Sequence, residues 1–286
     1  MKKKNLNILL GGFFLAVLTS CGNENIEKTA KEFSSELGID SSPVETTIQA
    51  SEIITGDYNY LILSKDKQDS SELTIDYAYY SIDDSGKTGV FFKDTINQVI
   101  ADFVYAVSDM NEERTRPSFS ISMFKESLPL FASFYEEMIQ DEITAEMFPW
   151  QIQSKIAIND SFPDFVQLTT SSWSYTGGAH GNGFIVYTLV SKEDGHDMKM
   201  NDFFKDLGEL NLLAAKLLKN DRELSVTEPL SNAGFWIEDE SNFLNENFYF
   251  ENGDLIVQFN PYEIASYADG PIEIRVSKSD LKPFLK

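Results

Sequence analysis

The stretch that decides the fold is Trp150-Gln151-Ile152-Gln153-Ser154-Lys155-Ile156-Ala157-Ile158, in which apolar and polar side chains alternate. Alternation with a period of two predicts a β-strand that buries one face. The same signature returns in residues 165–173 and 184–190. Between these two runs lies Tyr175-Thr176-Gly177-Gly178-Ala179-His180-Gly181, a glycine-rich segment that predicts the connection of a β-hairpin. The centre of the chain is therefore predicted to form an antiparallel sheet.

Strand and helix patterns continue on both sides of this central sheet. Glu251-Asn252-Gly253-Asp254 predicts a tight hairpin turn, and further strands are predicted within 44–63 and at 73–79, 247–250, 255–259 and 272–276. Apolar residues spaced three and four apart predict helices at 96–107, with Asp94 as its N-cap, at 128–143 and at 207–218. The fold class predicted is α+β, with mainly antiparallel sheets covered by a few helices. We expect two coupled α/β halves, residues 44–145 and 146–286.

The first twenty residues have the pattern of a secretory signal peptide. Lys2, Lys3 and Lys4 precede an apolar run from Ile8 to Leu18. This run is about half of the roughly 20 residues that a helix needs to cross a bilayer, so we expect it to be removed rather than kept as an anchor. Residues 1–20 are therefore predicted to be a signal peptide.

Leu18-Thr19-Ser20-Cys21 resembles the lipobox of bacterial lipoproteins, in which the cysteine is acylated and becomes the first residue. Cys21 is the only cysteine, so the chain has no internal disulfide to form. A buried or free thiol is the alternative. We expect residues 21–43 to be the lipidated cysteine and a tether, and the acyl chains to bind a lipid bilayer. The predicted location is the cell envelope, outside the cytoplasm, and the outer membrane in a Gram-negative bacterium.

Composition makes the predicted mature chain strongly acidic. Loss of the three signal-peptide lysines lowers the basic residues from 23 to 20 against 46 acidic ones, so the formal net charge falls from −23 to −26. Such a charge disfavours binding to nucleic acid and favours encounter with cationic partners. The same excess of Asp and Glu is also explained by solubility alone.

Several segments occur in an order that resembles one extracytoplasmic domain family. They are Tyr175-Thr176-Gly177-Gly178-Ala179-His180, Asn201-Asp202-Phe203-Phe204, Phe250-Glu251-Asn252-Gly253, Phe259-Asn260-Pro261-Tyr262-Glu263-Ile264-Ala265-Ser266-Tyr267-Ala268-Asp269-Gly270 and Ser279-Asp280-Leu281. This is the paired domain of unknown function in the external region of the lysozyme-sensing anti-sigma factor RsiV and the non-catalytic region of the peptidoglycan deacetylase PdaC. The resemblance covers roughly residues 44–286, with a PdaC-like N-terminal half and an RsiV-like C-terminal half.

The resemblance implies a domain that binds cell-envelope material or a protein such as lysozyme. The chain shows neither a sigma-binding region nor a deacetylase module, so we expect only the binding role to carry over. The residues that we expect to contribute to binding are Trp173, Tyr175, Gly177, Gly178, His180, Tyr262 and Tyr267.

Each of these residues has a structural alternative. Core packing explains Trp173 and Tyr175 equally well. His180 beside flexible glycines has the chemistry of a base or a ligand, but its ring also suits hydrogen bonds that fix the connection.

Metal and nucleotide chemistry are disfavoured. The only histidines, His180 and His196, are too few for a zinc site once the cysteine is acylated, and no phosphate-binding loop is present. The acidic turns Asp194–Asp197 and Glu238-Asp239-Glu240 leave calcium open without matching a calcium loop. We assign no cofactor, no metal and no catalytic residue.

The sequence therefore favours a membrane-anchored extracytoplasmic binding lipoprotein. Its expected ligand is a cationic protein such as lysozyme or a peptidoglycan-related cell-wall glycan. The competing hypothesis is an envelope glycan hydrolase that uses a carboxylate pair or His180.

Overall fold

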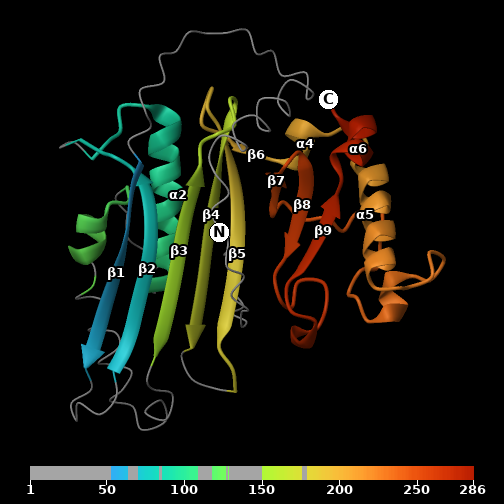
Figure 1. Ribbon diagram of the computed structural model, residues 1–286, viewed down its shortest axis with the longest axis horizontal. Coiled ribbons are helices and arrows are strands. Elements are labelled where there is room, and N and C mark those ends of the chain that lie inside the picture. The colour runs from blue at the N-terminus through green and yellow to red at the C-terminus, as the bar shows by residue number, and fades with distance from the viewer. Residues whose placement is uncertain are drawn as a thin grey trace, which may run out of the picture.

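Two β-sheets stand side by side, each with helices on one face (Figure 1). The structure is a computed structural model of the chain, and it describes residues 53–63, 70–83, 86–108, 118–126, 128, 150–175 and 179–286. The predicted signal peptide, the tether with Cys21, and the predicted helix at 128–143 beyond Leu128 lie outside the described residues. In the described residues no helix is long and apolar enough to span a bilayer.

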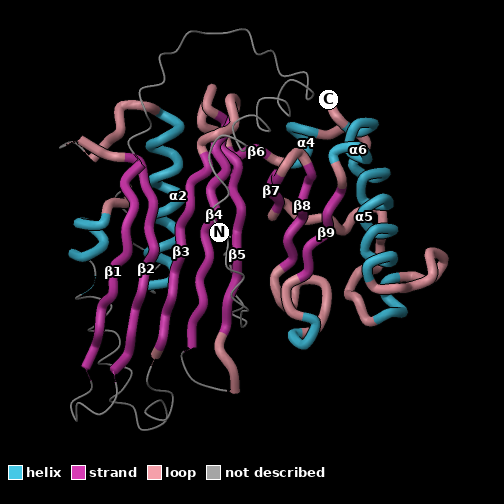
Figure 2. The backbone as a smooth tube through the Cα atoms, viewed as in Figure 1, coloured by secondary structure: helices cyan, strands magenta, loops and turns pink. Residues whose placement is uncertain are grey.

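The larger sheet has six strands in the order of the sequence (Figure 2). All neighbouring strands are antiparallel except β2 and β3, which run parallel and are connected through a crossover that contains helix α2. The strands are β1 (Ile53–Leu63), β2 (Ser70–Tyr80), β3 (Gln151–Asn159), β4 (Phe165–Tyr175), β5 (Asn182–Ser191) and β6 (Asp197–Met198). The sheet thus joins strands from both predicted halves, and the boundary between 145 and 146 stays a prediction.

Helix α2 (Phe91–Ser108) packs on one face of this sheet. Ile96, Ile100 and Val104 point from the helix into a core shared with Ile75 and Ile156 of the strands. Apolar residues spaced three and four apart lie on one face of the helix, and apolar residues spaced two apart lie on one face of each strand. These two apolar faces pack against each other and are buried.

The predicted start of this helix at Asp94 was wrong by one turn, because the helix begins at Phe91. Asp94 lies inside the first turn, and its carboxylate accepts a hydrogen bond from the backbone N–H of Thr88 at 2.6 Å. A carboxylate in the first turn is stabilised by the positive end of the helix dipole. Acidic residues are therefore common there as well as at the N-cap, and the sequence does not distinguish the two positions.

The smaller sheet is built from the last strands of the chain. It has the order β7 (Phe248–Glu251), β8 (Asp254–Phe259) and β9 (Ile272–Val276), and all pairs are antiparallel. The predicted turn between β7 and β8 is confirmed. Asn252 and Gly253 have φ values of 55° and 87°, as a two-residue hairpin turn of the primed type requires.

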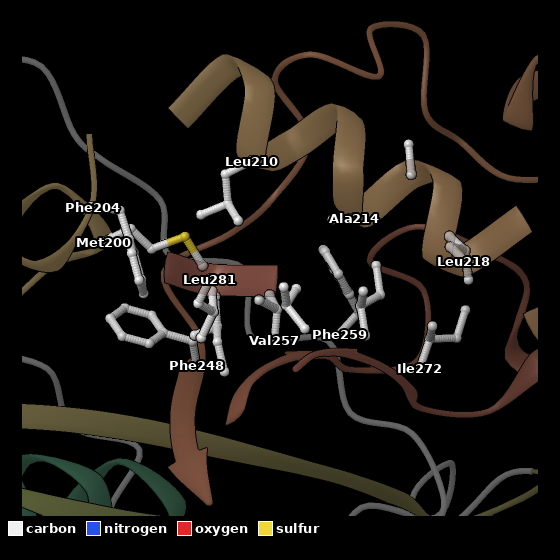
Figure 3. Close-up of a cluster of buried hydrophobic side chains, with 14 of the residues drawn as sticks. Met200, Phe204, Leu210, Ala214, Leu218, Phe248, Val257, Phe259, Ile272 and Leu281 are labelled. Carbon is white, nitrogen blue, oxygen red and sulfur yellow. The ribbon is translucent and has the colours of Figure 1, made fainter. Parts of the chain in front are cut away.

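Helix α5 (Leu207–Asp221) covers one face of the smaller sheet (Figure 3). Leu210, Ala214 and Leu218 recur at intervals of four and point toward Val257 of β8 and Ile272 of β9. The short elements of the C-terminal region are α4 (Met200–Phe203), η2 (Leu230–Ala233), η3 (Tyr267–Asp269), α6 (Lys278–Leu281) and η4 (Lys282–Phe284).

The two sheets share apolar contacts through Phe165 of β4. Its fully buried ring stacks on Phe162 at 4.4 Å between centroids and meets Phe203 edge-on at 5.6 Å and Phe250 at 5.9 Å. A strand of the large sheet therefore contributes to the core of the small one. The predicted α+β fold with mainly antiparallel sheets and a few helices is confirmed.

Candidate functional site

Four aromatic rings from three separate segments form a stacked column, which we call the aromatic row. His180 stacks on Tyr267 with 4.1 Å between centroids and 14° between planes. Tyr267 stacks on Tyr262 at 5.5 Å and 29°, and Tyr262 on Trp236 at 6.5 Å and 15°. Three of these residues were predicted from the sequence, and Trp236 was not.

The aromatic row lies at the protein surface. The side chain of Trp236 is 56% exposed and that of Tyr262 is 37% exposed. His180 is exposed as well, and Tyr267 is half-buried. Exposed aromatic rings in contact with one another are typical of interaction surfaces, because large rigid rings give contact area at little cost in conformational entropy.

Two asparagine side chains fix the C-terminal sheet, and with it the aromatic row, to the edge of β5. The Asn260 amide accepts a hydrogen bond from the N–H of Ile185 at 2.9 Å and donates one to the Ile185 carbonyl at 3.1 Å. Asn247 likewise accepts from the N–H of Tyr187 at 2.8 Å and donates to the Ile185 carbonyl at 2.9 Å. These amides take the place of a pairing strand at Ile185 and Tyr187, because β6 pairs with β5 only at Leu189 and Val190.

The position of Asn260 explains how the rings meet. Asn260 stands two residues before Tyr262, and Ile185 belongs to the strand that follows His180. The bonds between Asn260 and Ile185 therefore hold the segments that carry the two ends of the His180, Tyr267 and Tyr262 stack. We call this contact the amide latch.

Tyr262 occupies a turn position that normally suits glycine. The backbone N–H of Glu263 bonds to the carbonyl of Asn260 at 3.1 Å, and Pro261 and Tyr262 are the central residues of this turn. Tyr262 has a φ of 68°, in the left-handed region where a side chain costs of the order of 1 kcal/mol. A bulky residue kept in a strained turn is a feature that clusters at functional sites.

Trp236 reaches the row through a backbone contact. Its N–H donates to the carbonyl of Ile264 at 2.8 Å, next to the turn that holds Tyr262. It follows Gly234, whose φ of 92° ends the short helix η2. No periodic pattern surrounds Trp236, which explains why sequence reasoning missed it. An exposed tryptophan in an irregular segment was the only available signal.

Two other predicted residues lie on a different surface. Trp173 and Tyr175 are half-buried on β4, and neither is part of the row. The Trp173 ring lies so close to Gly181 that a Cβ atom there would be 2.5 Å from its Cζ2 atom. Gly181 is therefore required by close packing, and Trp173 approaches the row at the residue next to His180. The predicted binding residues Gly177 and Gly178 lie outside the described residues.

The C-terminal part of this site matches a known family model. Residues 201–279 match the family described as "Protein of unknown function (DUF3298)". The matched DUF3298 segment contains Trp236, Tyr262 and Tyr267, and His180 lies before it.

The whole architecture is similar to solved structures of DUF3298 proteins. One, a member of the family from Bacteroides fragilis, has a TM-score of 0.60 and 22% identity, over 83% of this chain and 94% of that one. A second, from Pseudomonas aeruginosa, has a TM-score of 0.53 and 14% identity, over 82% and 94%. At these identities the likeness shows the fold. No curated protein matches the chain.

One stretch within the matched DUF3298 segment is one-sided in charge. From Glu223 to Glu273 the chain contains eleven Asp and Glu residues and no Lys, Arg or His. Glu263 directly follows Tyr262, Asp269 lies two residues after Tyr267, and both acidic side chains are exposed. Glu263 accepts hydrogen bonds from the amides of Asn245 and Asn260, at 3.0 and 3.2 Å, which keeps its charge beside the amide latch. Three of the four rings thus lie in a stretch whose charged side chains are all acidic.

His180 makes one local hydrogen bond and one ring contact. Its Nδ1 lies 3.0 Å from the Gly181 carbonyl, and one face of the ring is covered by Tyr267. Within the described residues no carboxylate forms a hydrogen bond or ion pair with this ring. The imidazole is therefore held as a stacking element rather than paired with an acid.

The acidic turns that left calcium open have basic partners. Asp194 bonds to Nδ1 of His196 at 2.6 Å, and Glu240 bonds to Nζ of Lys219 at 2.7 Å. The hydrogen bond from His196 lowers the pKa of Asp194 to about 2, and the same bond raises the pKa of His196 above 6.5 despite partial desolvation. Across the described parts of the chain, no group of three or more His, Cys, Asp or Glu side chains is arranged to hold a metal ion.

Proposed function

We propose that the protein is a membrane-anchored extracytoplasmic binding lipoprotein that recognises a cationic protein such as lysozyme through the aromatic row. Acyl chains on Cys21 would hold it on a bilayer, after removal of residues 1–20. The basic start, short apolar run and lipobox-like Leu18-Thr19-Ser20-Cys21 support the anchor. The resemblance to the external region of RsiV and the non-catalytic region of PdaC supports a binding role.

The observation that carries the proposal is an exposed stack of rings within an acidic segment. A Lys or Arg side chain of a partner can stack on an exposed ring such as Trp236, a contact of about 0.5–2 kcal/mol. Carboxylates such as Glu263 and Asp269 can pair with neighbouring cations of the same partner. The rings would then contribute affinity, and the charge would speed encounter.

The other ligand class expected from the sequence is a cell-wall glycan. Aromatic rings also stack on sugars, but a neutral sugar gains nothing from exposed carboxylates such as Glu263 and Asp269 close to the rings. The charge therefore favours the cationic protein at this site.

The hydrolase alternative receives less support. General acid–base chemistry by His180 needs a partner that orients the imidazole and a substrate atom within hydrogen-bond reach. His180 instead packs its ring against Tyr267. We therefore propose recognition rather than turnover.

Binding kinetics of the full chain, purified from membranes in detergent, test the proposal. The probe is hen lysozyme, and lysozyme with its lysines acetylated is the matched probe of lower charge. We expect the double variant Trp236→Ala/Tyr262→Ala to lose at least about tenfold in affinity, as residues of an interface hot spot do. Val226→Ala, at a 58% exposed position outside the row, is the control and should bind as the unchanged protein does.

The same measurement separates charge from ring contacts. Raising salt from about 50 mM to about 500 mM should slow association much more than it speeds dissociation. Unchanged affinity in the double variant would reject the row as the site. If the unchanged protein binds lysozyme-free peptidoglycan and the double variant does not, the row would be reassigned to a glycan.

Mass spectrometry of the native protein tests the anchor separately. We expect a chain that starts at Cys21 and carries the mass of acyl groups on that residue. A chain that still contains residues 1–20, or an unmodified thiol, would contradict the lipoprotein assignment.

A further inference from the structure

The face of the six-stranded sheet opposite α2 has a separate chemistry from the aromatic row. Strand register places Asn59, Thr74, Gln153 and Trp173 in one line across β1, β2, β3 and β4. The next line toward the strand ends is Leu61, Glu72, Gln151 and Tyr175. Neighbours in a line share a face, because side chains alternate between faces along each strand. We call these two lines the open sheet face.

Burial shows which side of the sheet this is. On β3, Ile152, Ser154 and Ile156 are buried toward α2, whereas Gln151 and Gln153 between them are exposed. On β4 the residues opposite them, Tyr175 and Trp173, are half-buried. Each aromatic ring of this face therefore stands in register with an exposed glutamine.

The side chains of the open sheet face are those that recognise sugars. A glutamine or asparagine amide offers two donors and one acceptor with two lone pairs, which suits the paired hydroxyls of a sugar ring. A Trp or Tyr ring offers an apolar face for the C–H side of the same sugar. The Trp173 ring is braced against Gly181, so its orientation is set before any ligand binds.

The opposite end of the face is polar and ordered. Glu72 accepts hydrogen bonds from the amide of Asn59 across the strand pair and from the hydroxyl of Thr74. Next along the strands, Asp76 stands in register with Lys155, so opposite charges are side by side. The face as a whole has neither the one-sided charge of residues 223–273 nor an apolar centre of the kind found in protein interfaces.

We propose that the open sheet face binds an uncharged glycan chain, with sugars stacked on Trp173 and Tyr175 and hydrogen-bonded by Gln151 and Gln153. Four strands at about 4.8 Å spacing span about 14 Å from β4 to β1, a length that suits a short oligosaccharide lying across the strands. This inference goes beyond the proposed function, because it assigns a second ligand to a second surface. It does not depend on the aromatic row or on a cationic partner.

Calorimetric titration of the full chain with the tetramer of β-1,4-linked N-acetylglucosamine tests this inference. We expect saturable binding that weakens at least about fivefold in Gln151→Ala/Gln153→Ala, because the sugar hydroxyls lose both amide partners. Binding should disappear in Trp173→Ala, because the sugar ring loses the surface on which it stacks. Gln98→Ala, a substitution of the same type on α2, is the matched control and should leave binding unchanged.

The glutamine variants keep the test decisive if Trp173→Ala fails to fold. Both glutamines are exposed, so their substitution should leave the thermal midpoint within about 1–2 °C of the unchanged protein. Absence of tetramer binding, or binding that the glutamine variants leave intact, would overturn the inference. Loss of tetramer binding in Trp236→Ala/Tyr262→Ala alone would also overturn it, because the glycan would then belong to the aromatic row.

Discussion

The aromatic row and the open sheet face place their side chains by different means. The row collects rings from three loop segments and depends on the amide latch between Asn260 and Ile185. The face takes its side chains from the register of neighbouring strands. The loops hold exposed rings in an acidic stretch, with Tyr262 in a strained backbone conformation. The sheet instead holds amide side chains in regular lines across neighbouring strands. Because their supports differ, we expect that the two surfaces can be altered independently by substitutions away from the contact between Trp173 and Gly181.

The largest expected effect comes from Phe165, which connects the structural supports of both surfaces. Phe165→Ala removes a fully buried ring that lies on β4, like Trp173, but packs against Phe203 and Phe250. We expect a loss of about 3–5 kcal/mol in the free energy of unfolding, in one cooperative transition followed by circular dichroism. Phe91→Ala, at a ring that is 71% exposed, should change stability by less than about 0.5 kcal/mol. Two separate transitions would mean that the surfaces stand on independent units.

The amide latch should affect the row alone. Asn260→Ala leaves the N–H of Ile185 without its side-chain partner, whereas the Ile185 carbonyl keeps the bond from Asn247, and we expect a cost of about 1–3 kcal/mol in stability. We expect lysozyme affinity to fall while affinity for the sugar tetramer stays the same. Asn260→Asp keeps the acceptor for the Ile185 N–H and should recover part of the loss, and Asn232→Ala on η2 is the control. Equal losses for both ligands would show that the latch supports the whole molecule.

Strain at Tyr262 predicts a smaller difference between two variants that both lack the ring. Tyr262→Gly should be more stable than Tyr262→Ala by about 1 kcal/mol, because glycine adopts a φ of 68° without a Cβ clash. Chemical denaturation measures this difference. Both variants should lose lysozyme binding to the same extent, and a glycine variant that binds as well as the original would remove Tyr262 from the site.

The smallest expected effect concerns His196, which belongs to neither surface. The hydrogen bond to Asp194 holds the pKa of His196 above 6.5, so the protonated ring is favoured in the folded state. Its contribution to stability is complete below pH 6.5 and is lost as the pH rises through the folded pKa. Exposure of both side chains keeps this contribution small. An NMR titration should show the His196 pKa returning toward 6.5 in Asp194→Asn, with both binding activities unchanged, and an unaltered pKa would reject the assigned cause.

Elements with a clear period were predictable from the sequence. The alternation in Gln151–Asn159 reflects one face buried under α2, so pattern and burial agree there. In β4 the first four residues are all buried, because Phe165 and Gln167 contact the C-terminal part of the chain, and burial alternates only from Thr169 on. The start of α2 was misplaced because Asp94 bonds back to Thr88 from inside the first turn, where acidic residues are also favoured. Helix α4 and strand β6 have four and two residues, which is too short for either period to appear.

The candidate site was only partly predictable. His180, Tyr262 and Tyr267 stood out because they belong to recognisable segments, but nothing in the sequence showed that their rings stack. That contact depends on the bonds between Asn260 and Ile185, which are 75 positions apart. Trp236 joins the row from an irregular segment, where no spacing rule applies.

Four dissociation constants measured side by side give the most direct test. Lysozyme and the sugar tetramer are each titrated into Trp236→Ala/Tyr262→Ala and into Gln151→Ala/Gln153→Ala, with the unchanged protein as reference. We expect the ring variant to lose lysozyme and keep the tetramer, and the glutamine variant to do the reverse. A single variant that loses both ligands, or lysozyme binding that survives loss of both rings, would contradict the assignment of cationic-protein recognition to the aromatic row.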